Sequence, residues 1–274
     1  MKPFLEIITY LLPILYFVTV WLYARGFFSD ERFADRLKTP FLGVTLLLHL
    51  LYFIIRTNNL HHPPITSIFE LMSVLAFSIA VAYFYLETRT NVRGTGYFIL
   101  NLSFFFQLVS SLFIRNEVDV NPVLRSNWLG FHVTSALLGY AAIAISAVYG
   151  FLYLMLYHEI KASRFGVIYK KLPNLEVLEG LSFRATMFGF TLLTIAMILG
   201  ALWLPRAFEN YSYLDSKLIG TLLIWLLYGG GLLAKRIAGW KGRKMMILSL
   251  SAFGLALFSL SIINIFFSEF HTFY

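Results

Sequence analysis

The sequence predicts an all-α fold, a polytopic bundle of about eight transmembrane helices. Apolar residues make up 59% of the 274 positions and charged residues only 13%, about half the charged fraction of a soluble domain. The mean hydropathy is +0.74. Apolar stretches of the roughly 18 to 20 residues that cross a bilayer recur along the whole chain. We find no repeat, low-complexity tract or linker, and therefore expect residues 1–274 to form a single integral membrane domain.

Each expected span is an apolar run between charged or turn-forming residues. The first has too long an apolar stretch for a signal peptide and lacks a small-residue cleavage site, so we interpret it as a retained span. The fifth is long enough to project from the membrane, and the longest loop, about 159–183, is expected to be partly helical and interfacial. The spans are expected at 4–24, 40–55, 67–87, 96–114, 127–157, 185–204, 218–234 and 246–268.

The basic residues predict the orientation. Sixteen of the 22 Lys and Arg residues fall in the first, third, fifth and seventh loops. Cytoplasmic loops of membrane proteins carry an excess of Lys and Arg. The odd-numbered loops are therefore expected inside and both termini outside. The other six basic residues lie in the termini and the even-numbered loops: Lys2, Arg56, Arg115, Arg125, Arg206 and Lys217.

Composition also excludes several function classes. The chain has no cysteine, which rules out disulfides, thiolate ligands and covalent c-type haem attachment. The net charge is +8. Because the basic residues lie in short loops, where they set the membrane topology, we expect no nucleic-acid partner. No convincing nucleophile–base pair is present, and the protein is not expected to be an enzyme.

Four of the six histidines are expected on the outer face: His61, His62, His132 and His271. A neutral imidazole is a good ligand for zinc, copper and haem iron. His132 and His271 are isolated in sequence, and each lies among aromatic residues, which suits a flat macrocycle with an iron centre. Alternatively, these histidines and their aromatic neighbours are ordinary residues of the membrane interface, where aromatic side chains form a belt. The aromatic residues concerned are Trp128, Phe131, Tyr140, Phe270, Phe273 and Tyr274, with Phe208, Tyr211 and Tyr213 in the sixth loop.

Two further residues are candidates. His49 lies within the second span, where an ionisable group is expensive; it could ligate a second haem or be satisfied by one interhelical hydrogen bond. Glu70 lies near the outer end of the third span, close to His62. It could orient an imidazole or be an interfacial carboxylate. The few outer cations could pair with haem propionates or with lipid phosphate.

Several stretches resemble the cytochrome c assembly family of haem-handling membrane proteins, in its CcsA group and its shorter HemX-type branch. The order and spacing of the stretches are family-like, although no single one is specific. They are NWLGFHVTSALLGYAA (127–142), HPPITSIFELMSVLAF (62–77), LEGLSFRATMFGFTLLTIAMILGALW (178–203), GWKGRK (239–244), Asn264 and HTFY (271–274).

The resemblance implies that His132 and His271 are paired axial ligands of a non-covalent haem b on the outer face of a bacterial cytoplasmic membrane. It also implies a carrier that presents haem for cytochrome c maturation with a partner protein. Asp215, Lys217, Trp225 and Tyr228 match the CcsA pattern. Tryptophans expected there are replaced by Phe208, Ser212 and Leu214, a proline and a glutamate by Ser216 and Leu218, and a histidine by Leu233.

These departures favour the HemX-type branch and leave two alternatives. One is a regulator of glutamyl-tRNA reductase, the first step of tetrapyrrole synthesis, with the 159–183 loop docking the enzyme. The other is a small-molecule transporter with histidine proton relays, for which the spans offer few ionisable partners.

Overall fold

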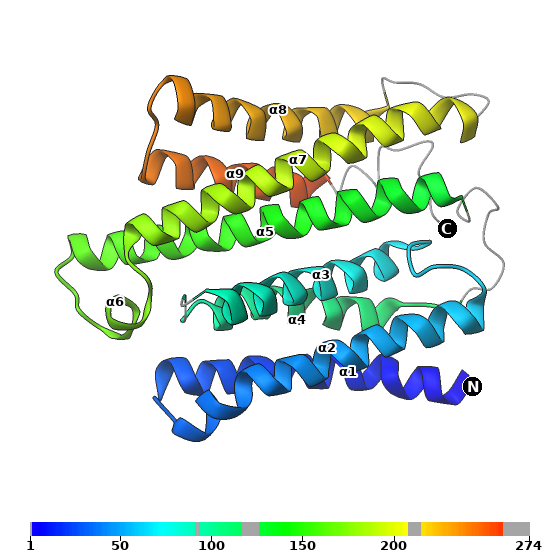
Figure 1. The fold of residues 1–274 in the computed structure, drawn as a ribbon, viewed down its shortest axis with the longest axis horizontal. Coiled ribbons are helices and arrows are strands. Elements are labelled where there is room, and N and C mark those ends of the chain that lie inside the picture. Colours follow the sequence, from blue (N-terminus) through cyan, green and yellow to red (C-terminus); the bar gives the residue numbers. More distant parts are fainter. Residues whose placement is uncertain (1, 91, 93, 117–125, 208–214, 260–274) are drawn as a thin grey trace. The chain divides into compact units, whose positions relative to one another are not determined.

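The computed structural model describes residues 2–90, 92, 94–116, 126–207 and 215–259, and within these ranges every regular element is a helix. The helices are α1 (Lys2–Phe28), α2 (Arg32–Leu60), α3 (Ile68–Arg89), α4 (Gly96–Phe113), α5 (Asn127–Lys161), α6 (Val167–Lys171), α7 (Leu175–Ala207), α8 (Ser216–Ile237) and α9 (Arg243–Phe258). Figure 1 shows these long helices, with the short helix α6 between α5 and α7.

The predicted polytopic helical fold is confirmed. In the described part of the chain, 7 helices are long and apolar enough to cross a membrane, namely α1 to α5, α7 and α8. The eighth predicted span begins as α9, and its remainder lies outside the described residues. At 35 residues, α5 is about 52 Å long, well beyond the hydrocarbon thickness of roughly 30 Å. It therefore projects, as the sequence indicates.

One predicted boundary differs: α2 starts at Arg32 and runs through Pro40, whereas the second span was expected from residue 40. The expectation that the 159–183 loop is partly helical is confirmed, because α5 continues to Lys161, α6 spans Val167–Lys171 and α7 begins at Leu175. Asn174 caps α7, since its Oδ1 accepts the Val177 N–H at 2.9 Å. A side-chain oxygen before the first turn satisfies an otherwise unpaired amide, and this capping signal was missed.

Contacts divide the chain into two compact units. The first comprises residues 1–126 with 170–173, and the second comprises 127–169 with 174–274. In the first unit α1 packs on α2 and α4, and α3 packs on α4. The first and third loops meet at one end of this unit, where Gly94 lies beside Phe27. That pairing agrees with the predicted topology, whereas the side of the membrane stays a prediction.

In the second unit α5 and α7 make the most extensive helix contact. They cross where Gly139 and Gly189 face each other, and a Cβ atom on Gly189 would lie 3.0 Å from the Gly139 carbonyl oxygen. Small residues allow this close approach of two membrane helices. About two turns further along α5, the Ser146 hydroxyl contacts those of Ser182 (3.0 Å) and Thr186 (2.6 Å).

We predict that Gly189→Ala destabilises the protein. Its new Cβ would also lie 2.8 Å from Ile143 Cγ1, and overpacking of a tight contact costs about 1–3 kcal/mol. The measurement is thermal unfolding of the detergent-purified protein by tryptophan fluorescence. Gly180→Ala on the same helix is the matched control, because a Cβ there meets nothing within 4 Å. Equal midpoints for the two variants would contradict a tight crossing at Gly189.

Candidate functional site

A buried chain of hydrogen bonds links all four helices of the first unit. Tyr16 from α1 bonds to His49 Nδ1 at 3.0 Å, and His49 Nε2 bonds to Ser73 on α3 at 3.0 Å. Ser73 then donates to Gln107 Oε1 at 2.9 Å, and Gln107 Nε2 donates to Ser111 at 3.0 Å, both on α4. Within the membrane, such bonds satisfy polar groups and hold helices together.

The direction of these bonds determines the tautomer of His49. The Ser73 hydroxyl has one proton, which it gives to Gln107, so His49 Nε2 must donate to the serine oxygen. Nδ1 then carries the lone pair and accepts the Tyr16 hydroxyl proton. Both ring nitrogens are thus engaged, and the imidazole is completely buried. The arrangement matches the interhelical hydrogen-bonding reading of His49 and provides no vacant nitrogen for a second haem.

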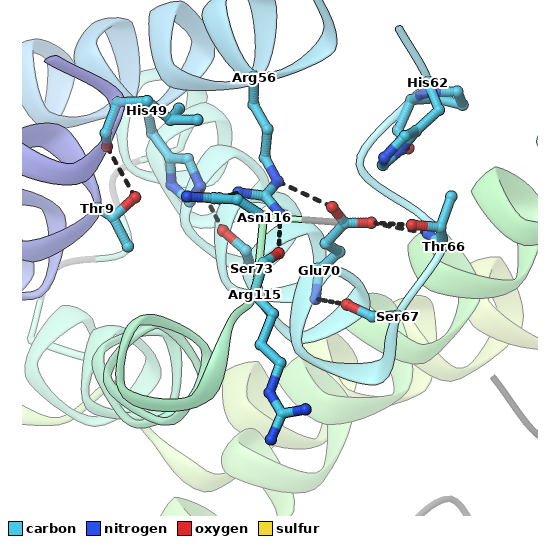
Figure 2. A network of polar contacts seen from close by, with 12 residues as sticks. Thr9, His49, Arg56, His62, Thr66, Ser67, Glu70, Ser73, Arg115 and Asn116 are labelled. Atoms are coloured by element: carbon cyan, nitrogen blue, oxygen red, sulfur yellow. Dashed lines mark hydrogen bonds and ion pairs between the residues drawn. The ribbon is translucent and has the colours of Figure 1, made fainter. Parts of the chain in front are cut away.

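The same unit holds a buried ion pair, about two turns further along α2 than His49. Arg56 Nε donates to Glu70 Oε1 at 2.8 Å, with both side chains almost fully buried. Arg56 also donates to Asn116 Oδ1 at 2.8 Å and to the Arg115 carbonyl at 2.7 Å. Figure 2 shows Glu70 between Arg56 and Thr66, and the Arg115 side chain pointing away. The guanidinium therefore ties α2, α3 and the end of α4 together.

Glu70 also orders the segment before α3. Its Oε2 accepts from the Thr66 backbone N–H and hydroxyl, each at 2.8 Å, and Ser67 caps the helix by accepting the Glu70 N–H at 3.2 Å. His61 ends α2 in the left-handed region, with φ of 60°. His62 is buried, and its Nδ1–H donates to the Pro63 carbonyl at 3.0 Å. The carboxylate is therefore a buried anchor for this loop and not an exposed interfacial group.

In the second unit, His132 lies against α7. Its Nδ1–H donates to the Ala196 carbonyl at 2.7 Å, and the half-buried ring covers Gly200, where a Cβ would lie 2.8 Å from His132 Cε1. Within a helix the Ala196 carbonyl also accepts the amide four residues on, which is Gly200. Glycine at that position gives the imidazole access to this carbonyl. The donated Nδ1 proton leaves the lone pair on Nε2, the arrangement typical of metal-ligating histidines.

The other predicted site residues divide between the units. Trp128, on α5, is half exposed, and Asp215 is buried immediately before α8, where its carbonyl accepts the Ile219 N–H at 3.0 Å. His49, His62 and Glu70 belong to the first unit and His132 to the second. The predicted residues outside the described ranges are Phe208, Tyr211 and His271. Within those ranges, no group of three His, Cys, Asp or Glu residues could hold a metal ion.

Sequence reasoning missed Arg56, Tyr16, Gln107 and Gly200. Arg56 was counted only as an outer cation, although an opposite charge at the near end of the next span was a usable signal for an ion pair. Tyr16 and Gln107 gave no comparable signal, because which face of a nearly all-apolar helix is buried depends on its neighbours. The role of Gly200 depends on a contact 68 positions away along the chain, with His132.

We predict that breaking the Arg56–Glu70 pair is costly and that removing both partners is less so. Glu70→Gln or Arg56→Met leaves a buried charge without its counter-charge, which costs about 3–5 kcal/mol. The double variant leaves none, so its loss in free energy of unfolding should be smaller than the sum of the single losses. The exposed Arg25–Glu31 pair, at 2.7 Å, is the control, and its disruption should cost at most about 1 kcal/mol. Additive losses at Arg56 and Glu70 would contradict the coupling.

Comparison with known proteins gives a consistent family assignment. Residues 35–272 match the family described as Cytochrome C assembly protein. The chain is 30% identical over 209 residues to the cytochrome c biogenesis protein CcsA of Guillardia theta, covering 69% of each. It is 28% identical over 221 residues to protein HemX of Brevibacillus brevis, covering 78% of this chain and 79% of the relative. The CcsA of Mesostigma viride is 24% identical over 91% of both chains. This multi-pass membrane protein therefore belongs to the cytochrome c assembly protein family.

Proposed function

We propose that the protein binds haem b non-covalently through the imidazoles of His132 and His271 and presents it at the outer membrane surface for cytochrome c maturation. The observation that carries this proposal is the His132 ring, which is oriented by the Ala196 carbonyl with its lone pair on Nε2. The family match, which extends to residue 272, supports the role of His271. A bound haem supplies an iron that accepts two axial nitrogen ligands.

The need for a partner follows from the composition. The chain lacks cysteine, so a separate cytochrome c maturation partner must provide thiol chemistry and hold the apocytochrome. The protein then acts as a carrier without its own catalytic step, in the cytoplasmic membrane of a bacterium. The aromatic residues Trp128, Phe208 and Tyr211 would contact the porphyrin, and Asp215 would border the site.

We expect the detergent-purified protein to show a low-spin haem spectrum after dithionite reduction. His132→Ala and His271→Ala should each lose haem or convert it to the high-spin form, because each removes one axial nitrogen. His158→Ala is the matched control, since His158 is exposed near the other end of α5. Unchanged low-spin spectra in both ligand variants would contradict the proposal.

We also predict that Gly200→Ala weakens haem ligation without touching a ligand. The added Cβ would lie 2.9 Å from His132 Nδ1 and displace the ring from the Ala196 carbonyl. The high-spin fraction and the haem lost on gel filtration should both rise. Gly130→Ala is the control, because it lies two residues from His132 and a Cβ there meets nothing within 4 Å. If the two variants have the same spectrum as wild type, the α7 contact does not position the ligand.

A second candidate function is regulation of glutamyl-tRNA reductase, which the likeness to protein HemX favours. The segment between α5 and α7 exposes Phe165 and Tyr169, whose rings contact at 4.9 Å, and this pair would dock the soluble enzyme. Reductase abundance and cytochrome c content in a deletion strain discriminate between the functions. Altered reductase with normal cytochrome c favours regulation, and the reverse favours haem presentation.

A further inference from the structure

A cavity of about 560 Å³ opens at one end of the first unit, where α1 and α3 end and α2 and α4 begin. Its size falls within the range of small-molecule sites, about 300–1,000 Å³. It lies at the end of the unit predicted to be cytoplasmic. About two helical turns or more separate it from the hydrogen-bond chain that contains His49. The lining residues used below are Tyr23, Phe27, Lys38, Tyr83, Glu87 and Tyr97.

Glu87 is the central polar group of this wall. Its carboxylate accepts hydroxyl protons from Tyr23, from Thr39 at 3.1 Å and from Tyr83 at 3.3 Å. An ionised carboxylate offers about four acceptor positions, so one remains for another donor. No Lys, Arg or His of the described part of the chain forms an ion pair with it. Three hydroxyl groups orient this negative charge, and none of them neutralises it.

The neighbouring charges are already balanced. Lys38 pairs with Asp35 at 2.7 Å, and Lys171 pairs with Asp30. Among the charged side chains that line the cavity in the described part of the chain, Glu87 is therefore the one without an ion-pair partner. Leaving a partly buried carboxylate without a counter-charge is unfavourable, and a bound cation would relieve that cost.

The aromatic walls favour the same kind of ligand. Rings of Tyr23, Phe27, Tyr83 and Tyr97 line the cavity, and the face of an aromatic ring attracts cations within about 6 Å. The Lys38 ammonium already lies 5.6 Å from the Tyr23 ring centroid. Aromatic faces combined with one carboxylate are suited to an organic ammonium group.

We propose that this cavity binds an organic ammonium group, with Glu87 as its counter-charge. The source favoured by the position, at the ends of membrane-spanning helices, is a phospholipid with a primary ammonium headgroup. This site is independent of the haem-binding function.

The test is thermal unfolding of the delipidated full-length protein during titration with dioleoyl phosphatidylethanolamine. Binding to the folded state raises the unfolding midpoint. Dioleoyl phosphatidylglycerol, which has no ammonium group, should raise it much less. In Glu87→Gln the apparent affinity for the ammonium lipid should fall at least tenfold. Glu176→Gln, an exposed carboxamide variant at the start of α7, should bind like wild type.

A second variant protects against a folding defect in Glu87→Gln. Thr88 lines the cavity and bonds only to carbonyls of its own helix, so Thr88→Phe should fill the cavity without removing a contact between helices. Loss of protection in Thr88→Phe supports the site. A parallel titration with ethanolamine hydrochloride identifies the source, since protection by both compounds means that the ammonium group suffices. Equal protection by the two lipids, or unchanged affinity in Thr88→Phe, would overturn the proposal.

Discussion

The first unit depends on one constraint, that a polar group inside the membrane must find its partner within the protein. The chain from Tyr16 through His49 and Ser73 to Gln107 meets it by taking side chains from all four helices. The direction of each bond follows from that of its neighbour, and together the bonds join all four helices. Arg56 lies about 10 Å along α2 from His49, and its pair with Glu70 repeats this principle at one end. Glu87, with its tyrosine hydroxyls, repeats it at the other.

The second unit is held together differently. At its main crossing, glycines bring α5 and α7 into backbone contact, and hydroxyl groups around Ser146 supply the polar bonds. Glycine has the same effect at position 200, where the missing side chain leaves the Ala196 carbonyl accessible to His132. Close packing of α5 on α7 and the orientation of the His132 ring therefore have one physical cause, the absence of a Cβ atom. The first unit is thus held by a chain of buried hydrogen bonds through His49, and the second, which contains His132, mainly by close helix packing at glycines.

The sequence predicted the helical membrane fold and the family, because span length and motif order are local properties. It placed the second and sixth spans at 40–55 and 185–204, inside helices that begin at Arg32 and Leu175, because the extensions 32–39 and 175–184 lack an apolar run. It named His132 as a candidate haem ligand, which stays a prediction, but not Gly200, whose contact with the His132 ring depends on the tertiary structure. His49 was left between two readings, and only the positions of Tyr16 and Ser73 distinguish them.

The central claim is that His132 is an axial ligand of haem iron. Near-infrared magnetic circular dichroism of the oxidised protein tests it most directly, because the charge-transfer band reports the chemical identity of the two axial ligands. We expect a bis-imidazole band in wild type that changes to an imidazole–thioether band in His132→Met. The same band in both proteins would contradict the account, since the iron would then be held by other residues.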